Sequence, residues 1–86
     1  MTRVLSDELG RFNIRANCIN PIVTMTDLAA RAWSDPAKSG PVLARISLSR
    51  FAEPADVAQV IAFLLSDASA MLNGLAIPID GGFLVR

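Results

Sequence analysis

Composition sets the first limits on what this chain can do. Its 86 residues are 52% apolar and 19% charged, a balance typical of a folded domain rather than a disordered chain. The formal net charge is zero and the pI is near 6.1, so the chain lacks the positive charge that nucleic acids and anionic membranes attract. The sequence contains no Tyr, no His and one Cys. These counts exclude, within this chain, a Ser-His-Asp triad, a Cys-His pair, a His-ligated zinc site and a Tyr proton donor.

The sequence shows no targeting or membrane-spanning pattern. Its longest apolar run is far shorter than the roughly 20 residues that span a bilayer. Residues 1–9 lack the apolar segment of a signal peptide. A single cysteine cannot form a disulfide framework. We therefore expect a cytoplasmic protein with no membrane and no nucleic acid among its partners.

Residues 1–10 are expected to be the end of a helix. Their apolar residues follow helical spacing, and Gly10 is expected to end the helix in the left-handed conformation. No capping residue precedes this helix, as in a segment of a longer protein. An initiating Met that begins a short helix is the alternative. The apolar residues are Met1, Val4, Leu5 and Leu9.

Residues 13–19 alternate in the manner of a short strand, which Asn20-Pro21 is expected to end. One face is apolar and includes Cys18, which we expect to be a buried thiol rather than a nucleophile. The other face carries Arg15 and Asn17. We expect Arg15 to form a structural ion pair or to cap a helix, and contact with an anion is the alternative.

Residues 24–33 are rich in Ala and Leu and are predicted to form a helix. Thr24 and Asp27 at its start have capping-box spacing. The sequence Ser34-Asp35-Pro36 is expected to end this helix. Residues 37–49 stay ambiguous, because they contain apolar residues at helical spacing and also a Gly40-Pro41 pair that interrupts helices.

The clearest predicted element is a helix over 54–67. Pro54 stands at the first helical position and acidic residues occupy the first turn. The apolar residues form a broad stripe, so we expect one side of this helix to lie against a sheet and another against a further partner. The stripe consists of Val57, Val60, Ile61 and Leu64, widened by Phe63 and Leu65.

Residues 75–79 are predicted to form an apolar strand, which Pro78 confines to a sheet edge. Two strands separated by helices are expected to pair in parallel, which makes the fold class α/β. A two-stranded sheet leaves strand edges and helix faces uncovered. The pattern therefore favours a single partial domain over 1–86, either a piece of a longer chain or part of an obligate assembly.

Several motifs run through the chain in a fixed order. They are NIRANCINP (13–21) with Thr24 and Thr26, RFAEPADVA (50–58), FLLSD (63–67), Asn73-Gly74 and IDGG (79–82). In this order and spacing they resemble the C-terminal third of the short-chain dehydrogenases/reductases. The segment from Met25 to Pro36 is most similar to the L-xylulose reductase and tetrameric carbonyl reductase branch.

The resemblance implies the C-terminal part of a Rossmann-type fold with an incomplete sheet. It also implies hydride transfer between NADP or NAD and a small carbonyl or alcohol of the sugar or dicarbonyl type. In the family, the Tyr proton donor, its Lys partner and the Gly-rich turn that binds the pyrophosphate lie before the point where this chain begins. The isolated chain is therefore expected to be inactive and to contain no catalytic residue. The alternative is a truncated, non-catalytic chain that only associates with full-length subunits.

The resemblance assigns a cofactor-side loop to residues 20–26. It implies that Pro21 lies against the nicotinamide, that the backbone of Thr24 contacts the carboxamide, and that Thr26 hydrogen-bonds the carboxamide or the phosphate region. The alternative is that Thr24 or Thr26 only caps the next helix. At Ile22 the loop departs from the family pattern, which usually has Gly there.

Residues 25–49 resemble the substrate lid of the family, in which Met25, Leu28 and Trp33 line a pocket. The alternative is that these residues only pack the lid helix against the core. The resemblance further implies a homo-oligomer, a tetramer in the family, with subunit contacts at 54–67 and 75–82. Asp80-Gly81-Gly82 within the second region is expected to form a turn and not a catalytic site.

Overall fold

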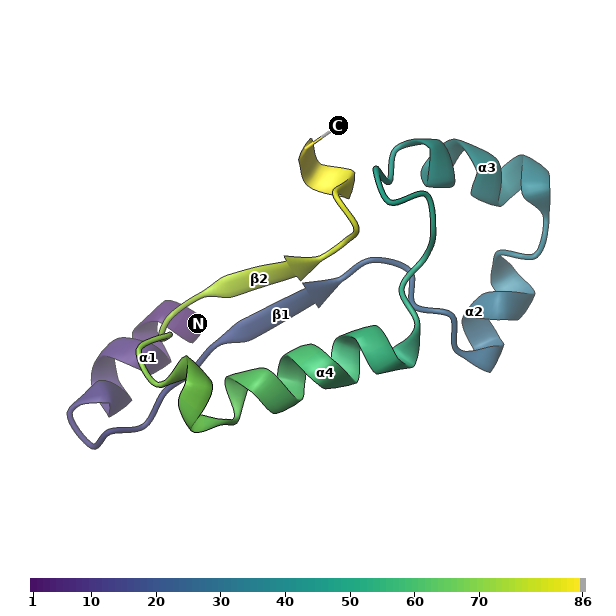
Figure 1. Ribbon diagram of the computed structural model, residues 1–86. Coiled ribbons are helices and arrows are strands. Elements are labelled where there is room, and N and C mark those ends of the chain that lie inside the picture. The colour runs from purple at the N-terminus through teal and green to yellow at the C-terminus, as the bar shows by residue number, and fades with distance from the viewer. Residues whose placement is uncertain (86) are drawn as a thin grey trace.

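Helices and two short strands build an elongated molecule with extents of 50 × 25 × 21 Å (Figure 1). The structure is a computed structural model that describes residues 1–85. In chain order its elements are α1 (Thr2–Gly10), β1 (Cys18–Pro21), α2 (Asp27–Ala32), α3 (Pro36–Ala44), α4 (Pro54–Leu64), η1 (Asp67–Ser69), β2 (Ala76–Ile79) and η2 (Phe83–Val85).

The two strands pair in parallel, and α2, α3 and α4 lie in the crossover between them. The register runs from Cys18 opposite Ala76 to Pro21 opposite Ile79. This arrangement confirms the predicted α/β class and the parallel pair. The predicted strand at 75–79 begins one position later, at Ala76.

Pro78 lies on the open side of β2. Backbone bonds join Cys18 N to Leu75 O at 2.8 Å and Ile22 N to Ile79 O at 3.0 Å. Alternate residues of β2 therefore hydrogen-bond to β1, and Pro78 turns its nitrogen the other way. Its missing N–H removes no bond between the strands, as expected for proline in an edge strand.

β1 begins later than the alternation predicts, at Cys18 instead of residue 13. Side-chain amides take the place of the strand ladder before that point. Asn73 Oδ1 accepts from Ala16 N at 3.0 Å, and Asn17 Oδ1 accepts from Leu75 N at 3.0 Å. The strand ends at Pro21, two positions after the predicted residue 19, so Asn20-Pro21 forms its last two residues. Proline fits there because Ile22 supplies the next N–H of the ladder.

Arg15 closes the C-terminal end of α4. Its Nη2 donates to Leu64 O at 3.0 Å and to Ser66 O at 3.3 Å, and its Nη1 donates to Ser69 O at 2.8 Å and to Leu72 O at 3.3 Å. The last carbonyls of a helix have no partners within the helix, so these bonds satisfy groups that otherwise depend on water. The predicted helix-capping role of Arg15 is confirmed.

α4 ends at Leu64, earlier than the predicted 54–67. The chain instead turns around Ser69, which is buried in η1. Ser69 Oγ lies 2.9 Å from Leu64 O and accepts from Arg15 Nη1 at 3.1 Å. The same guanidinium therefore holds the end of the helix and the turn that follows it.

The end of α1 differs from the prediction. Gly10 belongs to the helix, and Arg11 caps it with a right-handed φ of −63°. The left-handed residue is Asn13, with a φ of 60°. Asn adopts this conformation more readily than most residues, which allows the turn to come later than Gly10.

Helices α2 and α3 also begin and end at other residues than predicted. Thr26 caps α2, since its Oγ1 accepts from Ala29 N at 3.3 Å, so the prediction of a cap at Thr24 is wrong. α3 resolves the ambiguous segment as a helix that contains Pro41. Pro41 has no N–H to donate to Ala37 O, so it removes only one bond of the helix.

The buried apolar residues lie in the segment between α3 and α4. Ile46 is 0% exposed, and Phe51 and Ala52 are 8% and 7% exposed. α4, by contrast, has no buried residue. Cys18 is only half-buried, with Sγ 3.5 Å from Asn20 Oδ1, so the expectation of a buried core thiol is wrong.

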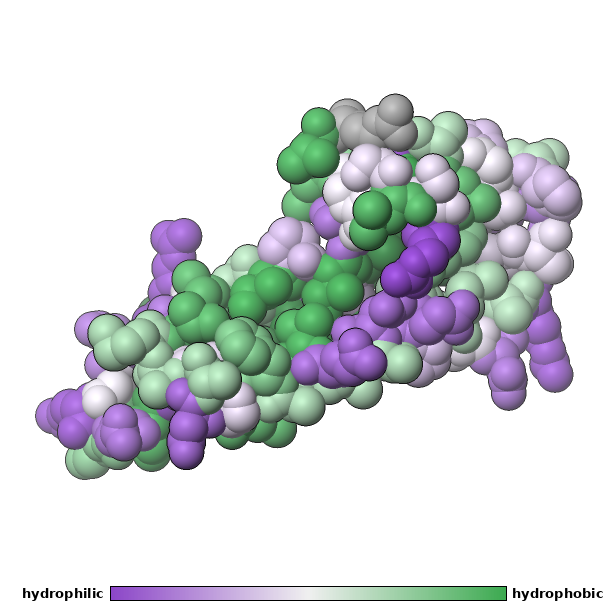
Figure 2. Space-filling view, viewed as in Figure 1, coloured by the Kyte–Doolittle hydropathy of each residue, from purple (hydrophilic) through white to green (hydrophobic). Residues whose placement is uncertain are grey.

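Apolar side chains remain exposed along α4. Ile61, Phe63 and Leu65 are 41%, 46% and 81% exposed. Figure 2 shows apolar residues gathered in the middle of the molecule, over the strands and α4. Within residues 1–85, no helix is long and apolar enough to cross a membrane.

We predict that Arg15→Met destabilises the purified protein by about 2 kcal/mol, because it leaves several partly buried carbonyls without donors. Chemical denaturation measures this change. Arg31→Met, which removes an exposed arginine from α2, is the matched control and is expected to change stability by less than about 0.5 kcal/mol. Equal effects of the two substitutions would contradict the capping role of Arg15.

Candidate functional site

The candidate loop leaves β1 at the carboxyl end of both parallel strands (Figure 1). Ligands of open α/β sheets bind outside this end of the strands. Pro21, expected in the loop, is the exposed last residue of β1 and lies opposite Ile79. Ile22 follows and is attached to β2 through its bond to Ile79 O. The sheet thus fixes the start of the loop.

Ala52 fixes the middle of the loop. Its N–H donates to Val23 O at 3.1 Å, and its C=O accepts from Met25 N at 2.8 Å. These two bonds form a parallel bridge between Thr24 and Ala52. In such a bridge the N–H and C=O of Thr24 itself point away from Ala52. The Thr24 C=O accepts from Thr26 N at 2.8 Å, and the Thr24 N–H donates to no residue in the described part of the chain.

The hydroxyls of the two threonines have different local partners. Thr24 Oγ1 donates to Ile22 O at 3.0 Å, which leaves its lone pairs able to accept. Thr26 Oγ1 accepts from Ala29 N at the start of α2, which leaves its hydrogen able to donate. The loop therefore offers a backbone donor, a hydroxyl acceptor and a hydroxyl donor within three residues.

Trp33 lies at the end of α2 and packs against Phe51. The ring centroids are 5.8 Å apart with an interplanar angle of 58°. Lys38 Nζ lies over the Trp33 ring, 5.1 Å from its centroid. These contacts tie α2 and α3 to the segment beside Ala52. Of the other two residues expected to line the substrate pocket, Met25 is half-buried and Leu28 is 77% exposed.

The segment after α3 is attached to the segment that follows β2. Leu48 N donates to Gly81 O at 2.9 Å, and Ser47 Oγ donates to the same oxygen at 2.9 Å. A Cβ on Gly82 would collide with Ser47 Oγ. Asp80 forms the turn, since its Oδ1 accepts from Gly82 N at 3.0 Å. This geometry agrees with the prediction of a turn at Asp80-Gly81-Gly82.

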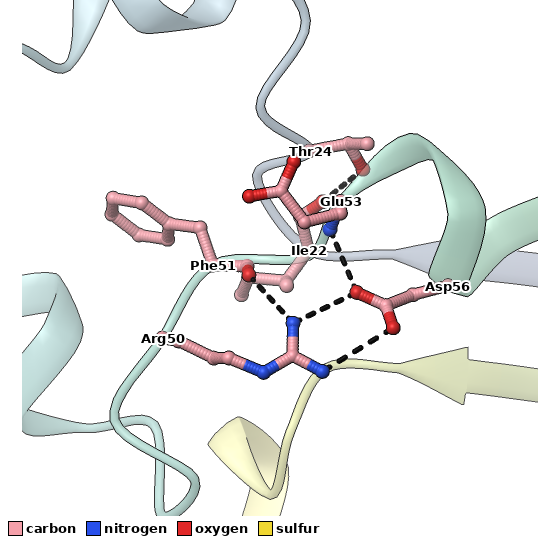
Figure 3. A network of polar contacts seen from close by, with 6 residues as sticks. All are labelled: Ile22, Thr24, Arg50, Phe51, Glu53 and Asp56. Carbon is pink, nitrogen blue, oxygen red and sulfur yellow. Dashed lines mark hydrogen bonds and ion pairs between the residues drawn. The ribbon is translucent and has the colours of Figure 1, made fainter.

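An ion pair holds the segment between α3 and α4 (Figure 3). Arg50 Nη1 donates to Asp56 Oδ2 at 2.8 Å and to Phe51 O at 3.2 Å, and Nη2 donates to Asp56 Oδ1 at 3.2 Å. Asp56 Oδ2 also accepts from Glu53 N at 2.8 Å, at the start of α4. The hydrogen bond with Arg50 and that with the Glu53 backbone lower the pKa of Asp56 to about 2, and the bond to Asp56 raises the pKa of Arg50.

Sequence reasoning missed this network. It treated Asp56 only as an acidic residue in the first helical turn and Arg50 only as part of a motif. The available signal is the spacing Glu53-Pro54-x-Asp56, in which an acidic residue at the third helical position can accept from the residue before the helix.

A groove of about 440 Å³ lies between α4 and the ends of the strands. Its lining combines the Arg50–Asp56 pair with apolar side chains of the loop, of α4 and of their neighbours, namely Ile22, Val60, Phe63, Phe51 before α4 and Ile79 at the end of β2. Met25, Leu28 and Trp33 are not in this lining, so the groove differs from the pocket expected beside the lid. Residues 1–85 contain no cluster of three or more side chains suited to hold a metal ion.

We predict that Asp56→Asn lowers the melting temperature near neutral pH and that this difference shrinks in acid. The pKa of Asp56 is about 2 in the folded protein and near 3.8 in the unfolded chain. Its contribution is therefore fully present above pH 3.8 and is lost as the pH falls toward 2.

Thermal melts of the wild type and the variant at about pH 6, 4 and 3 measure the difference. Asp67→Asn, which makes the same charge change beyond the other end of α4, is the control and is expected to show little difference at any pH. A difference for Asp56→Asn that stays constant with pH would contradict the ion-pair contribution.

Sequence comparison finds close relatives over nearly the whole chain. L-xylulose reductase of Bos taurus is 51% identical over 84 residues, which are 98% of this chain and 34% of that protein. D-erythrulose reductase of Gallus gallus is 51% identical over 85 residues, covering 99% and 35% of the two chains. The chain thus spans about a third of the length of these relatives.

Solved structures share its fold. A short-chain type dehydrogenase/reductase from Mycobacterium ulcerans superposes with a TM-score of 0.94 at 36% identity, over 99% of this chain and 31% of that one. A structure named as a 2-deoxy-D-gluconate 3-dehydrogenase from Agrobacterium tumefaciens, with bound NADP, gives a TM-score of 0.92 at 31% identity, over 99% and 35% of the chains.

A family model described as enoyl-(acyl carrier protein) reductase matches residues 1–84. The relatives, the structures and this model agree on one family of oxidoreductases with Rossmann-type folds. The parallel strands, the loop at their carboxyl end and these similarities together show that the chain belongs to the short-chain dehydrogenase/reductase family.

Proposed function

We propose that these residues form the C-terminal third of an NAD(P)-dependent oxidoreductase that acts on a small carbonyl or alcohol of the sugar or dicarbonyl type. The observation that carries this proposal is the loop after β1, whose Thr24 N–H donates to no residue in the described part of the chain and lies where family members hold their cofactor. The substrate class follows from the relatives named L-xylulose reductase and D-erythrulose reductase.

The loop fits the nicotinamide end of the cofactor by its hydrogen-bonding groups. A carboxamide both accepts and donates, and the Thr24 N–H, the Thr26 hydroxyl and the Thr24 oxygen offer both kinds of partner. Pro21 provides a rigid surface beside these groups. The bound nicotinamide supplies the hydride chemistry, and the residues of this chain bind and orient it.

The capping role of Thr26 is compatible with cofactor binding. Its oxygen accepts from Ala29 N and caps α2, whereas its hydrogen remains able to bond a ligand. The start of the lid and the cofactor would then share one hydroxyl. Residues 25–49 act in this proposal as the substrate lid, with Met25, Leu28 and Trp33 available to contact substrate.

We assign the exposed apolar surfaces of α4 and β2 to contacts between subunits. The exposed apolar face of α4 and the open edge of β2 lie within 54–67 and 75–82, where we propose that a second copy of the protein binds. The second candidate function, a non-catalytic chain that only associates with full-length subunits, is supported by the same exposed face and by the absence of Tyr.

The two candidate functions predict different sizes for the native polypeptide, that is, the intact chain as it occurs in source cells. Its intact mass in source cells, detected with an antibody against residues 34–49, is expected to be several times the 9.2 kDa of these residues. A native mass of 9.2 kDa would contradict the enzyme proposal and favour the associating chain.

We also predict that the 86-residue chain alone does not bind NADPH at micromolar concentrations, whereas the native polypeptide does. The chain has five glycines, at positions 10, 40, 74, 81 and 82, and their spacing cannot build the turn that binds the pyrophosphate. Quenching of Trp33 fluorescence reports binding to the short chain. Saturable quenching of the short chain would contradict this prediction.

Substitutions at Thr26 separate cofactor contact from helix capping. We predict that Thr26→Asp, which keeps a good capping oxygen but no hydroxyl hydrogen, weakens NADPH binding to the native polypeptide about tenfold, as does Thr26→Val. Thr26→Ser keeps both roles and is expected to bind as the wild type does. If Thr26→Asp also binds normally, Thr26 only caps the helix.

A further inference from the structure

Ala52 stands between the candidate loop and the Arg50–Asp56 ion pair, and both of its peptide units connect the two. In the unit before Ala52, Phe51 O accepts from Arg50 Nη1 at 3.2 Å and Ala52 N donates to Val23 O at 3.1 Å. One end of this plane is therefore held by the ion pair and the other end holds the loop.

The peptide unit after Ala52 repeats the arrangement. Its Glu53 N–H donates to Asp56 Oδ2 at 2.8 Å, and its Ala52 C=O accepts from Met25 N at 2.8 Å. Rotation of either rigid plane breaks a bond to the ion pair and a bond to the loop together. Figure 3 shows Arg50 and Asp56 on one side of this segment and Thr24 on the other.

We propose that Arg50 and Asp56 are positioning residues for the cofactor-side loop, acting through the two peptide planes of Ala52. This inference rests on the proposed function of the loop. The bridge with Ala52 sets the direction of the Thr24 N–H, and that N–H is the group assigned to the carboxamide. Loss of the ion pair frees the planes and lets this donor turn away from the nicotinamide.

The side chains themselves are not part of the buried core. Arg50 and Asp56 are 57% and 31% exposed, while Ala52 between them is 7% exposed. An exposed ion pair contributes little to stability on average. An effect of the pair on the fold weakens the binding of every ligand equally, whereas an effect on the loop weakens only ligands that reach the loop.

The test compares a complete cofactor with a fragment that lacks the nicotinamide. Asp56→Asn and Arg50→Gln are made in the native polypeptide, and dissociation constants are measured for NADPH and for 2′-phospho-ADP-ribose, or for NADH and ADP-ribose if the wild type prefers NADH. We expect the dinucleotide to bind about 2- to 30-fold more weakly to both variants. The fragment should bind unchanged, because it does not reach the loop.

Binding of the fragment also controls for folding. A variant that is partly unfolded binds the fragment and the dinucleotide more weakly by the same factor, so poor folding is not mistaken for loss of positioning. Asp67→Asn, beyond the other end of α4, is the control and should leave both constants unchanged. If Asp56→Asn does not fold, Arg50→Lys, which keeps the charge and loses the paired bonds to the carboxylate, takes its place.

Each outcome has a distinct meaning. Equal weakening of the dinucleotide and the fragment overturns the proposal, since it shows a general structural role. Unchanged binding of both ligands also overturns it. Two results for the wild type contradict the proposed function itself. One is that it binds the dinucleotide no more tightly than the fragment, and the other is that it binds neither ligand.

Discussion

Two backbone bonds to Ala52 connect the loop after β1 to the segment before α4. They hold Val23 and Met25 at 3.1 and 2.8 Å, and Phe51 beside Ala52 packs against Trp33 at the end of α2. Past β1 the loop has few partners in the sheet, because within the described chain Ile22 is the one residue of 22–26 that hydrogen-bonds to β2. The shape of the candidate site therefore depends on how firmly this one alanine is held.

The distribution of burial agrees with this view. The buried apolar residues Ile46, Phe51 and Ala52 lie in the segment that joins α3 to α4, beside the loop. The sheet and α4 bury less, and side chains such as Phe63 remain exposed. The part of the chain with the most complete packing is thus the part next to the candidate site.

Elements with strong local signals were predictable from the sequence. The helix at α4, the parallel pair and the edge position of Pro78 follow from spacing and proline chemistry, and helix capping was one of the two structural roles expected of Arg15. The errors arise where side chains compete with the backbone. Asn17 and Asn73 replace ladder bonds and delay β1, and the Arg50–Asp56 pair joins residues whose contact no periodicity reveals. The roles of Pro21, Thr24 and Thr26 toward a cofactor remain predictions.

The most direct test of this account is amide hydrogen exchange in the native polypeptide, followed residue by residue with and without saturating NADPH. The amides of Met25 and Ala52 are already bonded, so both should exchange slowly in either state. The Thr24 amide should exchange rapidly without cofactor and slow markedly when NADPH binds. A Thr24 amide whose exchange does not change at saturation would show that the loop does not hold the nicotinamide.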